Sequence, residues 1–529
     1  MNNELNALLR DVQYSFLWTA PEILLALGAL LLLAIEALAG PPVRKRLEPV
    51  VALMTVGLAF VTNLLLHLQS AAIDVHHLAW GDMVAIDAQT GILRAVILAT
   101  LFLGYCFALR RQVWNAVRSE YYALTMFSAV GAIVMVQATH LLILVMGLEI
   151  LSLPLYTLAA MRKQDARSRE AGLKYFVLGS LSSGLLIYGI ALLYGGSGSA
   201  HYEQLYAANL HRGLYQAGAV LVLAGLLFKG GLMPFYVWSP DVYEGAPDAF
   251  VGLMAALAKV GAFGALIRLA APFFSAVPGG LEATLAVVAA LTMVLGNLLA
   301  LAQTNLKRLL AYSSVAHAGY LLLGVLALGP RGDAGLAQSA IVFYLATYLL
   351  TIVAAFALVS LLRGKEGGWE LADLEGAASR HPAFAFTLAV LMFSLAGIPP
   401  LAGFFGKAYT FHAAVGAGYT GLAVLGMLTS VVSVFYYLRV IVAMYLRPER
   451  AHLPLEDGGP AGRFATRAIV VYLLVLGLLP GIVYGPAWMA ARHSGRPEVF
   501  PPRALPNDQV RQAQNAVFGP VLVERFPNP

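Results

Sequence analysis

The stretch AGLLFKGGLMPFYVWSPDVYEGAP at 224–247 decides the fold, because it is an apolar segment interrupted in its middle. Lys229, a Gly-Gly pair and Pro234 stand where a membrane helix would be continuous. Proline removes a backbone donor and clashes with the preceding turn, so we expect two half-helices joined by a short break. At membrane depth such a break is tolerated only inside protein or beside a hydrated cavity. The stretch therefore predicts a membrane protein with a polar interior.

A second apolar segment, LMFSLAGIPPLAGFFGKAYTF at 391–411, is interrupted by Pro399 and Pro400 and carries Lys407. The two breaks are five predicted spans apart. Since five is odd, the second unit is expected to cross the membrane in the opposite direction to the first. This pattern is typical of inverted repeats, here a first repeat at 121–270 and a second at 281–446.

Composition extends the membrane assignment to the whole chain. Sixty per cent of the 529 residues are hydrophobic and only 12% are charged, against roughly a quarter charged in soluble proteins. A spanning helix needs about 20 mostly apolar residues. We expect an all-α polytopic membrane protein of about fourteen transmembrane helices, with two inverted five-helix repeats that each contain a broken helix. The predicted spans are 20–39, 49–68, 88–109, 121–138, 140–161, 173–194, 214–238, 248–270, 281–302, 306–328, 336–362, 383–411, 415–446 and 465–490. Residues 1–120 hold the first three spans, and 491–529 form an extended tail.

Basic residues alternate along the loops and give an orientation. The loops after odd-numbered spans hold 19 Lys and Arg residues, and the connections between even-numbered spans and the next span hold only Arg212 and Arg331. By the positive-inside rule the odd loops are cytoplasmic. Both termini are therefore expected on the outer side, which is periplasmic in a bacterial inner membrane.

Four ionisable residues lie deep in predicted spans: Glu149, Lys229, Lys259 and Lys407. Each costs roughly 2.5–3.5 kcal/mol at the bilayer centre on insertion scales, so their presence favours an ion or proton path. Burial favours the neutral amine and a nearby carboxylate favours the ammonium. Breaking and restoring a Glu149–Lys229 pair would therefore release and rebind a proton, which Lys259 and Lys407 would pass on through water. His317 is a candidate intermediate, because imidazole titrates near neutral pH.

Structural interpretations stand beside these functional ones. Glu149 could be a static partner that holds two helices together, and His317 could be a satisfied core histidine. Lys174 opens the sixth span beside a basic loop, where snorkelling to the surface is expected. Glu22 and Glu36 lie at the two ends of the first span and are expected at the interface.

Several chemistries have no signature in the sequence. A single cysteine, Cys106, excludes a disulfide framework, an iron–sulfur cluster and a cysteine-rich zinc site within this chain. No GxGxxG follows a strand, and there is no Walker A motif or metal-ligand cluster. The energy for transport is therefore expected to come from another subunit or from an ion gradient.

Five long motifs resemble one family. They are MGLEILSLPLYTLAA at 146–160, EAGLKYFVLGSLSSGLLIYGIALLYG at 170–195, LLFKGGLMPFYVWSPDVYEGAP at 226–247, LKRLLAYSSVAHAGYLL at 306–322 and SLAGIPPLAGFFGK at 394–407. Together they resemble subunit N of the proton-pumping NADH–quinone oxidoreductase, respiratory complex I, within the antiporter-like membrane subunits. The WSPDVYEGAP stretch favours subunit N over the sister subunits L and M. After EGAP the family usually continues with a Thr-Pro-like step, where this chain has Asp248-Ala249.

The resemblance implies roles and surroundings for this chain. The pairing glutamate of the family falls on Glu149, its broken-helix lysine on Lys229, its central lysine on Lys259 and its distal lysine on Lys407; Lys174 also matches a family lysine. The implied enzyme is a proton translocase that couples electron transfer from NADH to a quinone, such as ubiquinone, to proton pumping. NAD, FMN, iron–sulfur clusters and quinone would be bound by other subunits, with none in this chain. The implied partners are other complex I subunits, especially subunit M and small membrane subunits such as K, together with the lipid bilayer and no nucleic acid.

Other functions share some of these features. A subunit of a multi-subunit sodium/proton antiporter would carry the same broken helices and lysines without needing NADH or quinone. A membrane subunit of a related hydrogenase or other dehydrogenase is a second alternative, and a purely structural scaffold is a third. Neighbouring genes for flavin and iron–sulfur subunits would favour complex I.

Overall fold

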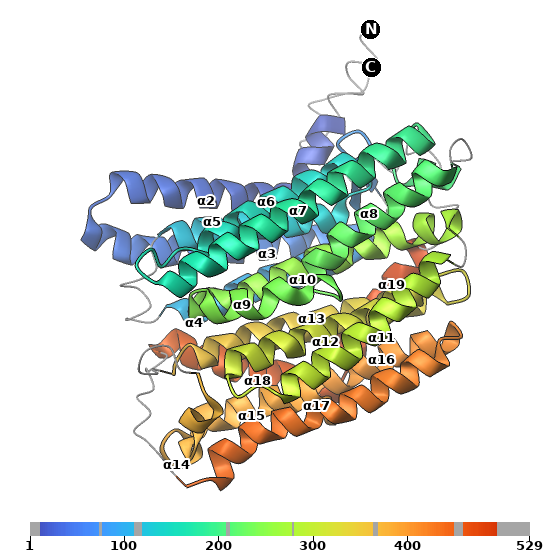
Figure 1. Ribbon diagram of the computed structural model, residues 1–529. Coiled ribbons are helices and arrows are strands. Elements are labelled where there is room, and N and C mark those ends of the chain that lie inside the picture. Colours follow the sequence, from blue (N-terminus) through green and yellow to red (C-terminus); the bar gives the residue numbers. More distant parts are fainter. Residues whose placement is uncertain are drawn as a thin grey trace.

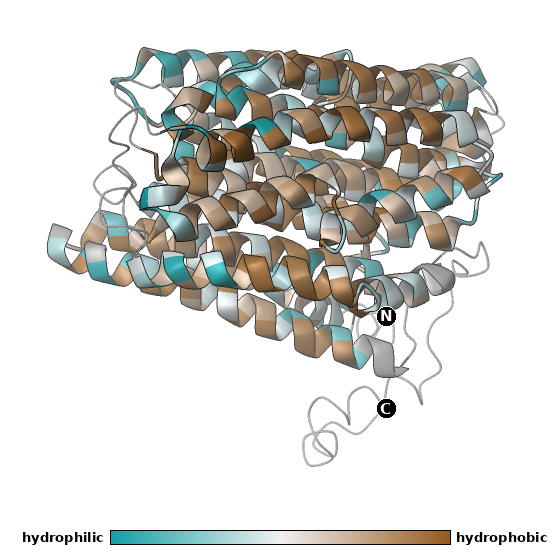
Figure 2. Ribbon diagram, turned by 90° about the horizontal axis from the view of Figure 1, so that it is seen from below, coloured by the Kyte–Doolittle hydropathy of each residue, from teal (hydrophilic) through white to brown (hydrophobic). Residues whose placement is uncertain are grey.

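A computed structural model describes residues 11–73, 77–109, 119–207, 212–277, 280–362, 369–448 and 459–494. Most of these residues form helices that run roughly side by side (Figure 1). In the described part, twelve helical segments are long and apolar enough to cross a membrane. Figure 2 shows hydrophobic residues along the middle of the helices and hydrophilic residues mostly towards their ends. The predicted class, an all-α polytopic membrane protein, is confirmed, while the count of about fourteen spans stays a prediction.

The N-terminal part consists of three long helices and a small hairpin. The helices are α2 (Ala20–Leu38), α3 (Pro41–Ile73) and α4 (Ala88–Ala108). The hairpin pairs β1 (His77–Ala79) with β2 (Val84–Ile86) in antiparallel register, which the sequence analysis did not predict. Asp87 caps α4 by accepting a hydrogen bond from the Thr90 amide. Helix α2 packs on α5 and α4 on α10, so this part is joined to the first predicted repeat.

The first predicted repeat contains the first broken helix. Its elements are α5 (Ser119–Gln137), α6 (Leu141–Ala159), α7 (Ala166–Ser197), η2 (Glu203–Ala207), α8 (Arg212–Gly230), η3 (Phe235–Val237), α9 (Trp238–Gly245) and α10 (Asp248–Ala276). Helix α8 ends at Gly230, and Gly231 has a positive φ of 72°. The predicted break is therefore confirmed, and α9 is the second half-helix. Helix α10 begins at Asp248, the first residue of the predicted eighth span.

The second predicted repeat contains the second broken helix. Its elements are α11 (Gly280–Leu301), α12 (Leu306–Leu326), α13 (Ala334–Val359), η5 (Leu371–Leu374), α14 (Ala377–Arg380), α15 (Pro382–Ala396), α16 (Ala402–Gly416) and α17 (Thr420–Leu446). The packing of α11 on α12 and α17 parallels that of α5 on α6 and α10. The packing of α15 on α17 likewise parallels that of α8 on α10. These matching pairs support two related units, whose opposite direction across a membrane stays a prediction.

The C-terminal span differs from the prediction. Instead of one helix over 465–490, the chain forms α18 (Gly459–Leu478) and α19 (Gly481–Ser494). Pro480 lies between them and cannot donate the backbone hydrogen bond that would continue α18. Helix α19 packs on α13 and α4. The predicted tail at 491–529 lies outside the described residues from 495 onward.

Two helices occupy the centre of the bundle. The apolar windows of α10 and α13 are completely buried inside the protein, and the two helices pack against each other (Figure 1). Helix α12 is almost as deeply buried and packs on both. Side chains on these helices are thus shielded from lipid by the rest of the chain, which is where buried charges can be accommodated.

Candidate functional site

Lys229 lies in the last turn of α8, directly before the first break, and only 2% of the residue is exposed. Its ammonium donates a hydrogen bond of 2.7 Å to Ser152 Oγ on α6 and one of 3.4 Å to the Tyr175 hydroxyl on α7. The amine also lies 5.4 Å from the ring centroid of Tyr156 and 5.2 Å from that of Tyr175. Ring faces attract a cation at such distances. Three neighbouring side chains, Ser152, Tyr156 and Tyr175, therefore hold the Lys229 amine in place inside the core.

Glu149 lies on α6 three residues before Ser152, which places the two side chains on nearby parts of the helix surface. In the described structure there is no ion pair between Glu149 and Lys229 within 4.0 Å; the lysine contacts Ser152 instead. Glu149 Oε1 is buried without a hydrogen-bond partner. The predicted pair is thus absent as a direct contact.

Lys259 lies in the middle of α10, and 3% of the residue is exposed. Its ammonium donates a 2.9 Å hydrogen bond to the carbonyl oxygen of Gly230, the last residue of α8. The final carbonyls of a helix have no partner within the helix and carry a partial negative charge. The break thus creates the acceptor that holds this lysine in the apolar core.

Lys407 lies on α16 and is held in the same way at the second break. Its ammonium donates a 2.9 Å hydrogen bond to the carbonyl oxygen of Ala396, the last residue of α15, and one of 2.8 Å to Ser430 Oγ on α17. Gly397 follows with φ of 84°, and a Cβ there would lie 3.0 Å from Lys407 Cδ. Both the backbone conformation and the close approach of the lysine stem require glycine at this position.

His317 lies on α12 and has hydrogen-bond partners on both ring nitrogens. Its Nδ1 is 2.6 Å from the Tyr344 hydroxyl on α13, and its Nε2 is 3.2 Å from the Tyr437 hydroxyl on α17. The edge of Tyr320 contacts the imidazole, and the Lys407 amine lies 5.4 Å from the centroid of the same tyrosine ring. Tyr320 is therefore situated between His317 and Lys407.

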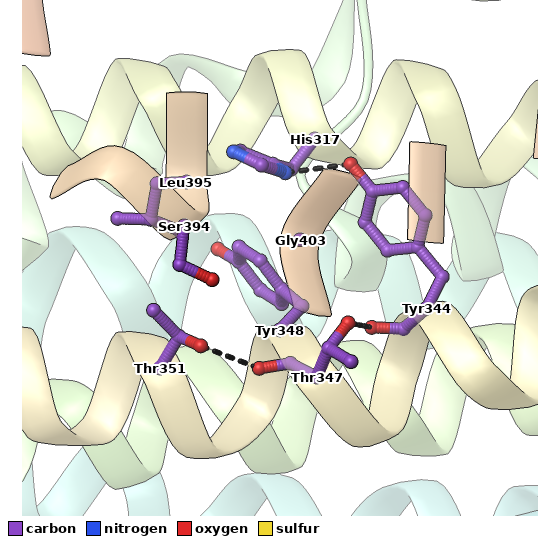
Figure 3. Close-up of a pocket in the computed structure, with 8 residues that line it drawn as sticks. All are labelled: His317, Tyr344, Thr347, Tyr348, Thr351, Ser394, Leu395 and Gly403. Atoms are coloured by element: carbon purple, nitrogen blue, oxygen red, sulfur yellow. Dashed lines mark hydrogen bonds between the residues drawn. The ribbon is translucent and has the colours of Figure 1, made fainter. Parts of the chain in front are cut away.

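A small cavity adjoins His317 and the second break (Figure 3). Its lining residues come from α12, α13, α15 and α16 and are His317, Tyr344, Thr347, Tyr348, Thr351, Ser394, Leu395 and Gly403. About 10 Å³ is available to the centre of a water-sized sphere, which is close to the space that one water molecule needs. The hydroxyl and imidazole groups supply the polar partners for such a water. The second break therefore adjoins a space that can hold water, which is one of the two surroundings expected for a break at membrane depth.

Lys174 occupies a different environment from the other lysines. It lies near the start of α7 with 42% of its side chain exposed, and it forms ion pairs of 2.7 Å with Glu170 and 2.8 Å with Asp241. Asp241 on α9 is also 3.0 Å from Arg308 on α12. Lys174 is thus a partly exposed residue, which we call a rim residue, and its amine pairs with one acidic side chain on α7 and one on α9.

The rim pair belongs to a larger set of charges, which we call the α9 ion cluster. Its members are Arg162, Glu170, Lys174, Asp241, Glu244, Asp248, Lys307 and Arg308. Each of the two aspartates has one cation from the α6–α7 region and one from α12. Lys307 is the most deeply buried cation of the cluster, pairs with Asp248 and donates a 3.0 Å hydrogen bond to the Glu244 carbonyl. The cluster therefore links the two predicted repeats.

Two further buried ion pairs involve the N-terminal part, and the second of them joins it to the first predicted repeat. Glu22 is 6% exposed and pairs with Arg94 at 2.7 Å, so it is covered by protein, while its expected position at the membrane interface stays a prediction. The burial follows from the packing of α2 on α5, which covers this end of α2. Arg268 on α10 pairs with Asp87 at 2.9 Å. In each pair a carboxylate contacts a guanidinium, and we interpret both pairs as structural contacts.

The structure brings most of the predicted residues into one interior. Lys229, Lys259, His317 and Lys407 are all buried, and Glu149 lies about one helical turn from Ser152, which contacts Lys229. Sequence reasoning missed the groups that hold them, notably Ser152, Tyr175 and Ser430. Helical spacing from Glu149 was a usable signal for Ser152, whereas nothing in the sequence pointed to Ser430. Among the described residues, no group of three or more His, Cys, Asp and Glu side chains is placed to hold a metal ion.

Two broken helices, in each of which the last carbonyl before the break accepts a hydrogen bond from a buried lysine, define an antiporter-like membrane subunit. The family model described as NADH:quinone oxidoreductase/Mrp antiporter, TM, matches residues 138–433. The chain belongs to the subunit N family of the NADH–quinone oxidoreductases. Its relatives include subunit N of Granulibacter bethesdensis, 39% identical over 90% of this chain and 99% of the relative. Subunit N of Myxococcus xanthus is 36% identical over 89% and 96% of the two chains.

Solved structures share the fold. A chain of respiratory complex I from Thermus thermophilus with bound Aureothin is 37% identical, with a TM-score of 0.75 over 88% of this chain and 98% of that one. A chain of the Mrp complex from Dietzia sp. DQ12-45-1b has a TM-score of 0.78 over 91% and 99% of the two chains at 22% identity. At that identity the second likeness shows the fold alone.

Proposed function

We propose that this chain is the proton-translocating membrane-arm subunit of an NADH–quinone oxidoreductase. In this assembly, electron transfer from NADH to a quinone such as ubiquinone drives proton movement through this chain. The relatives named as subunit N, which match almost from end to end, support the proposal. The observation that carries it is the set of three lysines buried in the apolar core, each with hydrogen-bond acceptors provided for its ammonium.

The proposed proton path runs along the interior from Glu149 through Lys229, Lys259 and His317 to Lys407. Lys174 stands at the rim, where its exposed amine meets the aqueous side. The path needs carriers that gain and lose a proton, and amine, imidazole and carboxyl groups in a poorly hydrated site do so when their partners move. Water in the cavity beside His317, held by its hydroxyl and imidazole groups, would complete the contact towards the second break.

The proposed first step is proton exchange at Lys229. In the described arrangement its ammonium is held by Ser152 and two tyrosines, and Glu149 Oε1 has no hydrogen-bond partner. Moving the amine from Ser152 to Glu149 would form the ion pair and stabilise the charged lysine. Returning it would remove the carboxylate and favour release of the proton towards Lys259. The unpartnered carboxyl oxygen supports this two-position model.

The proposed surroundings follow from membership of the family. Neighbouring subunits would include the antiporter-like subunit M and small membrane subunits such as K. NAD, FMN, iron–sulfur clusters and quinone would be bound elsewhere in the assembly, and this chain would act as a translocase without a redox centre. The membrane would be the bacterial inner membrane, with both termini on the periplasmic side.

Proton pumping in inverted membrane vesicles tests the proposal. Replacing Glu149 with Ala should sharply lower the number of protons pumped per NADH oxidised, because Lys229 loses its alternative partner. Glu170→Gln is the matched control, since that glutamate is exposed and, within the described part of the chain, has Lys174 as its ion-pair partner. If assembled Glu149→Ala complex pumped like the control, the assignment of this carboxylate to the path would be wrong.

A further inference from the structure

We infer that Tyr175 and Trp238 form an aromatic gate over Lys229, and that the Lys174–Asp241 ion pair is the latch that holds this gate closed. The inference rests on the proposed function, because it concerns access of protons to Lys229. It gives two buried aromatic residues and one rim pair a positioning role in proton transfer.

The gate residues are stacked and attached to the site they cover. The rings of Tyr175 on α7 and Trp238 on α9 are 4.5 Å apart at an interplanar angle of 12°. Trp238 Nε1 donates a 3.1 Å hydrogen bond to the carbonyl oxygen of Phe228, the residue before Lys229. The Tyr175 hydroxyl accepts a hydrogen bond from Lys229 itself. The stack therefore bridges α7, α8 and α9 directly at the lysine.

The latch lies one step further from the core on the same two helices. Lys174 is the residue before Tyr175 on α7, and Asp241 is three residues after Trp238 on α9, which is about one helical turn. Lys174 and Asp241 have 42% and 37% of their side chains exposed, whereas Tyr175 is fully buried and Trp238 is 2% exposed. The aromatic stack is thus the barrier between the aqueous rim and Lys229 along the α7–α9 contact.

The latch also connects the gate to the second predicted repeat. Asp241 pairs with Lys174 through Oδ2 and with Arg308 on α12 through Oδ1. Arg308 contacts Glu244 at 2.8 Å as well, so α9 is held from both sides (Figure 1). A shift of α12 would therefore pull on Asp241 and loosen its contact with Lys174. Separating α7 from α9 would then unstack Tyr175 and Trp238 and open access to Lys229.

Thiol labelling in the assembled complex tests the gate. Ser152→Cys places a thiol beside the Lys229 amine, at a residue that is completely buried. The only native cysteine of the chain, Cys106, is replaced by Ala in all variants. Inverted membrane vesicles are exposed to a small charged methanethiosulfonate reagent, and the labelled fraction of this chain is followed over time by mass spectrometry. Further substitutions are then added to this reporter.

The gate predicts a clear order of labelling rates. Asp241→Asn and Trp238→Ala should each raise the rate at least tenfold, because one removes the latch and the other removes half of the stack. Trp238→Phe keeps an aromatic ring, so its labelling rate should stay near that of the reporter alone. The labelling rate of Glu170→Gln should also stay near that of the reporter, because this change leaves the Lys174–Asp241 pair intact. Rates for Asp241→Asn and Trp238→Ala within twofold of the reporter, in complexes that assemble normally, would overturn the gate.

Labelling does not depend on proton pumping, so the gate and the proposed function can fail separately. Faster labelling of the latch variants would support the gate even in a complex whose pumping is unaffected by loss of Glu149. In a chain without the reporter, Asp241→Asn should also lower proton pumping per NADH, with Glu170→Gln as control. Unchanged pumping in Asp241→Asn would contradict the positioning role of the latch.

Discussion

Replacing Asp248 with Asn should destabilise the protein more than any other single change in the α9 ion cluster. Lys307 is buried, with 3% of its side chain exposed, and Asp248 is the carboxylate that pairs with it. The other direct contacts of the amine are the Glu244 and Ala246 carbonyls and the ring of Trp369, which are neutral. The substitution therefore leaves a buried ammonium without a carboxylate in direct contact.

The structure predicts the size of the loss of stability, and it predicts that Asp248→Asn and Lys307→Met lose different amounts. Leaving one member of a buried pair uncompensated costs about 3–5 kcal/mol, and we expect this range for Asp248→Asn. Lys307→Met should cost less than half as much stability, because Asp248 keeps Arg162 as an ion-pair partner at 3.3 Å. The Arg162 side chain is 43% exposed, so the remaining pair stays in contact with water. The double variant Asp248→Asn/Lys307→Met should be more stable than Asp248→Asn alone, because no unpaired charge remains in the core.

Unfolding in mixed detergent micelles with increasing SDS, followed by circular dichroism, measures these differences. The four proteins form a double-mutant cycle, which isolates the coupling between Asp248 and Lys307. Equal losses of stability in the two single variants would refute the asymmetry. A double variant less stable than Asp248→Asn would refute the account of the buried pair itself.

Three further predictions concern the second break and one buried ion pair. Gly397→Ala should cost about 1–3 kcal/mol of stability, because a φ of 84° is unfavourable for alanine. The added Cβ should also displace Lys407 and lower proton pumping. Unchanged pumping would contradict the close approach of Lys407 to Gly397. Ser430→Ala removes one of the two hydrogen bonds of the Lys407 ammonium, each worth about 1.5–3 kcal/mol to a charged group, so pumping should fall severalfold and recover in Ser430→Thr. Burial raises the pKa of the Asp87 carboxyl, but the charge of Arg268 and hydrogen bonds outweigh it and lower the pKa from 3.8 to about 2. The ionised carboxylate therefore contributes about 2 kcal/mol of stability above pH 4 that is lost as the pH falls towards 2. Thermal unfolding of Asp87→Asn should lack this part of the pH dependence, and an unchanged pH profile would count against it.

The fold was predictable from the sequence where hydropathy and proline act locally. The breaks at Pro234 and at Pro399-Pro400 are where the sequence placed them, because loss of a backbone donor needs no tertiary information. Pro480 carries the same signal and was overlooked in a span that looked continuously apolar. The hairpin of β1 and β2 was missed because its strands are three residues each, too short for a periodic pattern.

The candidate site was predictable in its charges but not in their partners. Lysines within apolar spans are conspicuous, and Lys229, Lys259 and Lys407 are all buried as expected. Their acceptors are the ends of broken helices and hydroxyl groups on other helices, which depend on helix packing. The burial of Glu22 could not be predicted for the same reason, since α5, which packs on α2, lies about a hundred residues away in the sequence.

Proton pumping by Lys229→Ala tests the central claim most directly. The assembled variant complex is measured in inverted vesicles as protons pumped per NADH oxidised, beside Glu170→Gln as the rim control. If Lys229 is the exchanging group of the path, pumping should fall severalfold while the control stays normal. Normal pumping per electron in a correctly assembled Lys229→Ala complex would contradict a proton path through this residue.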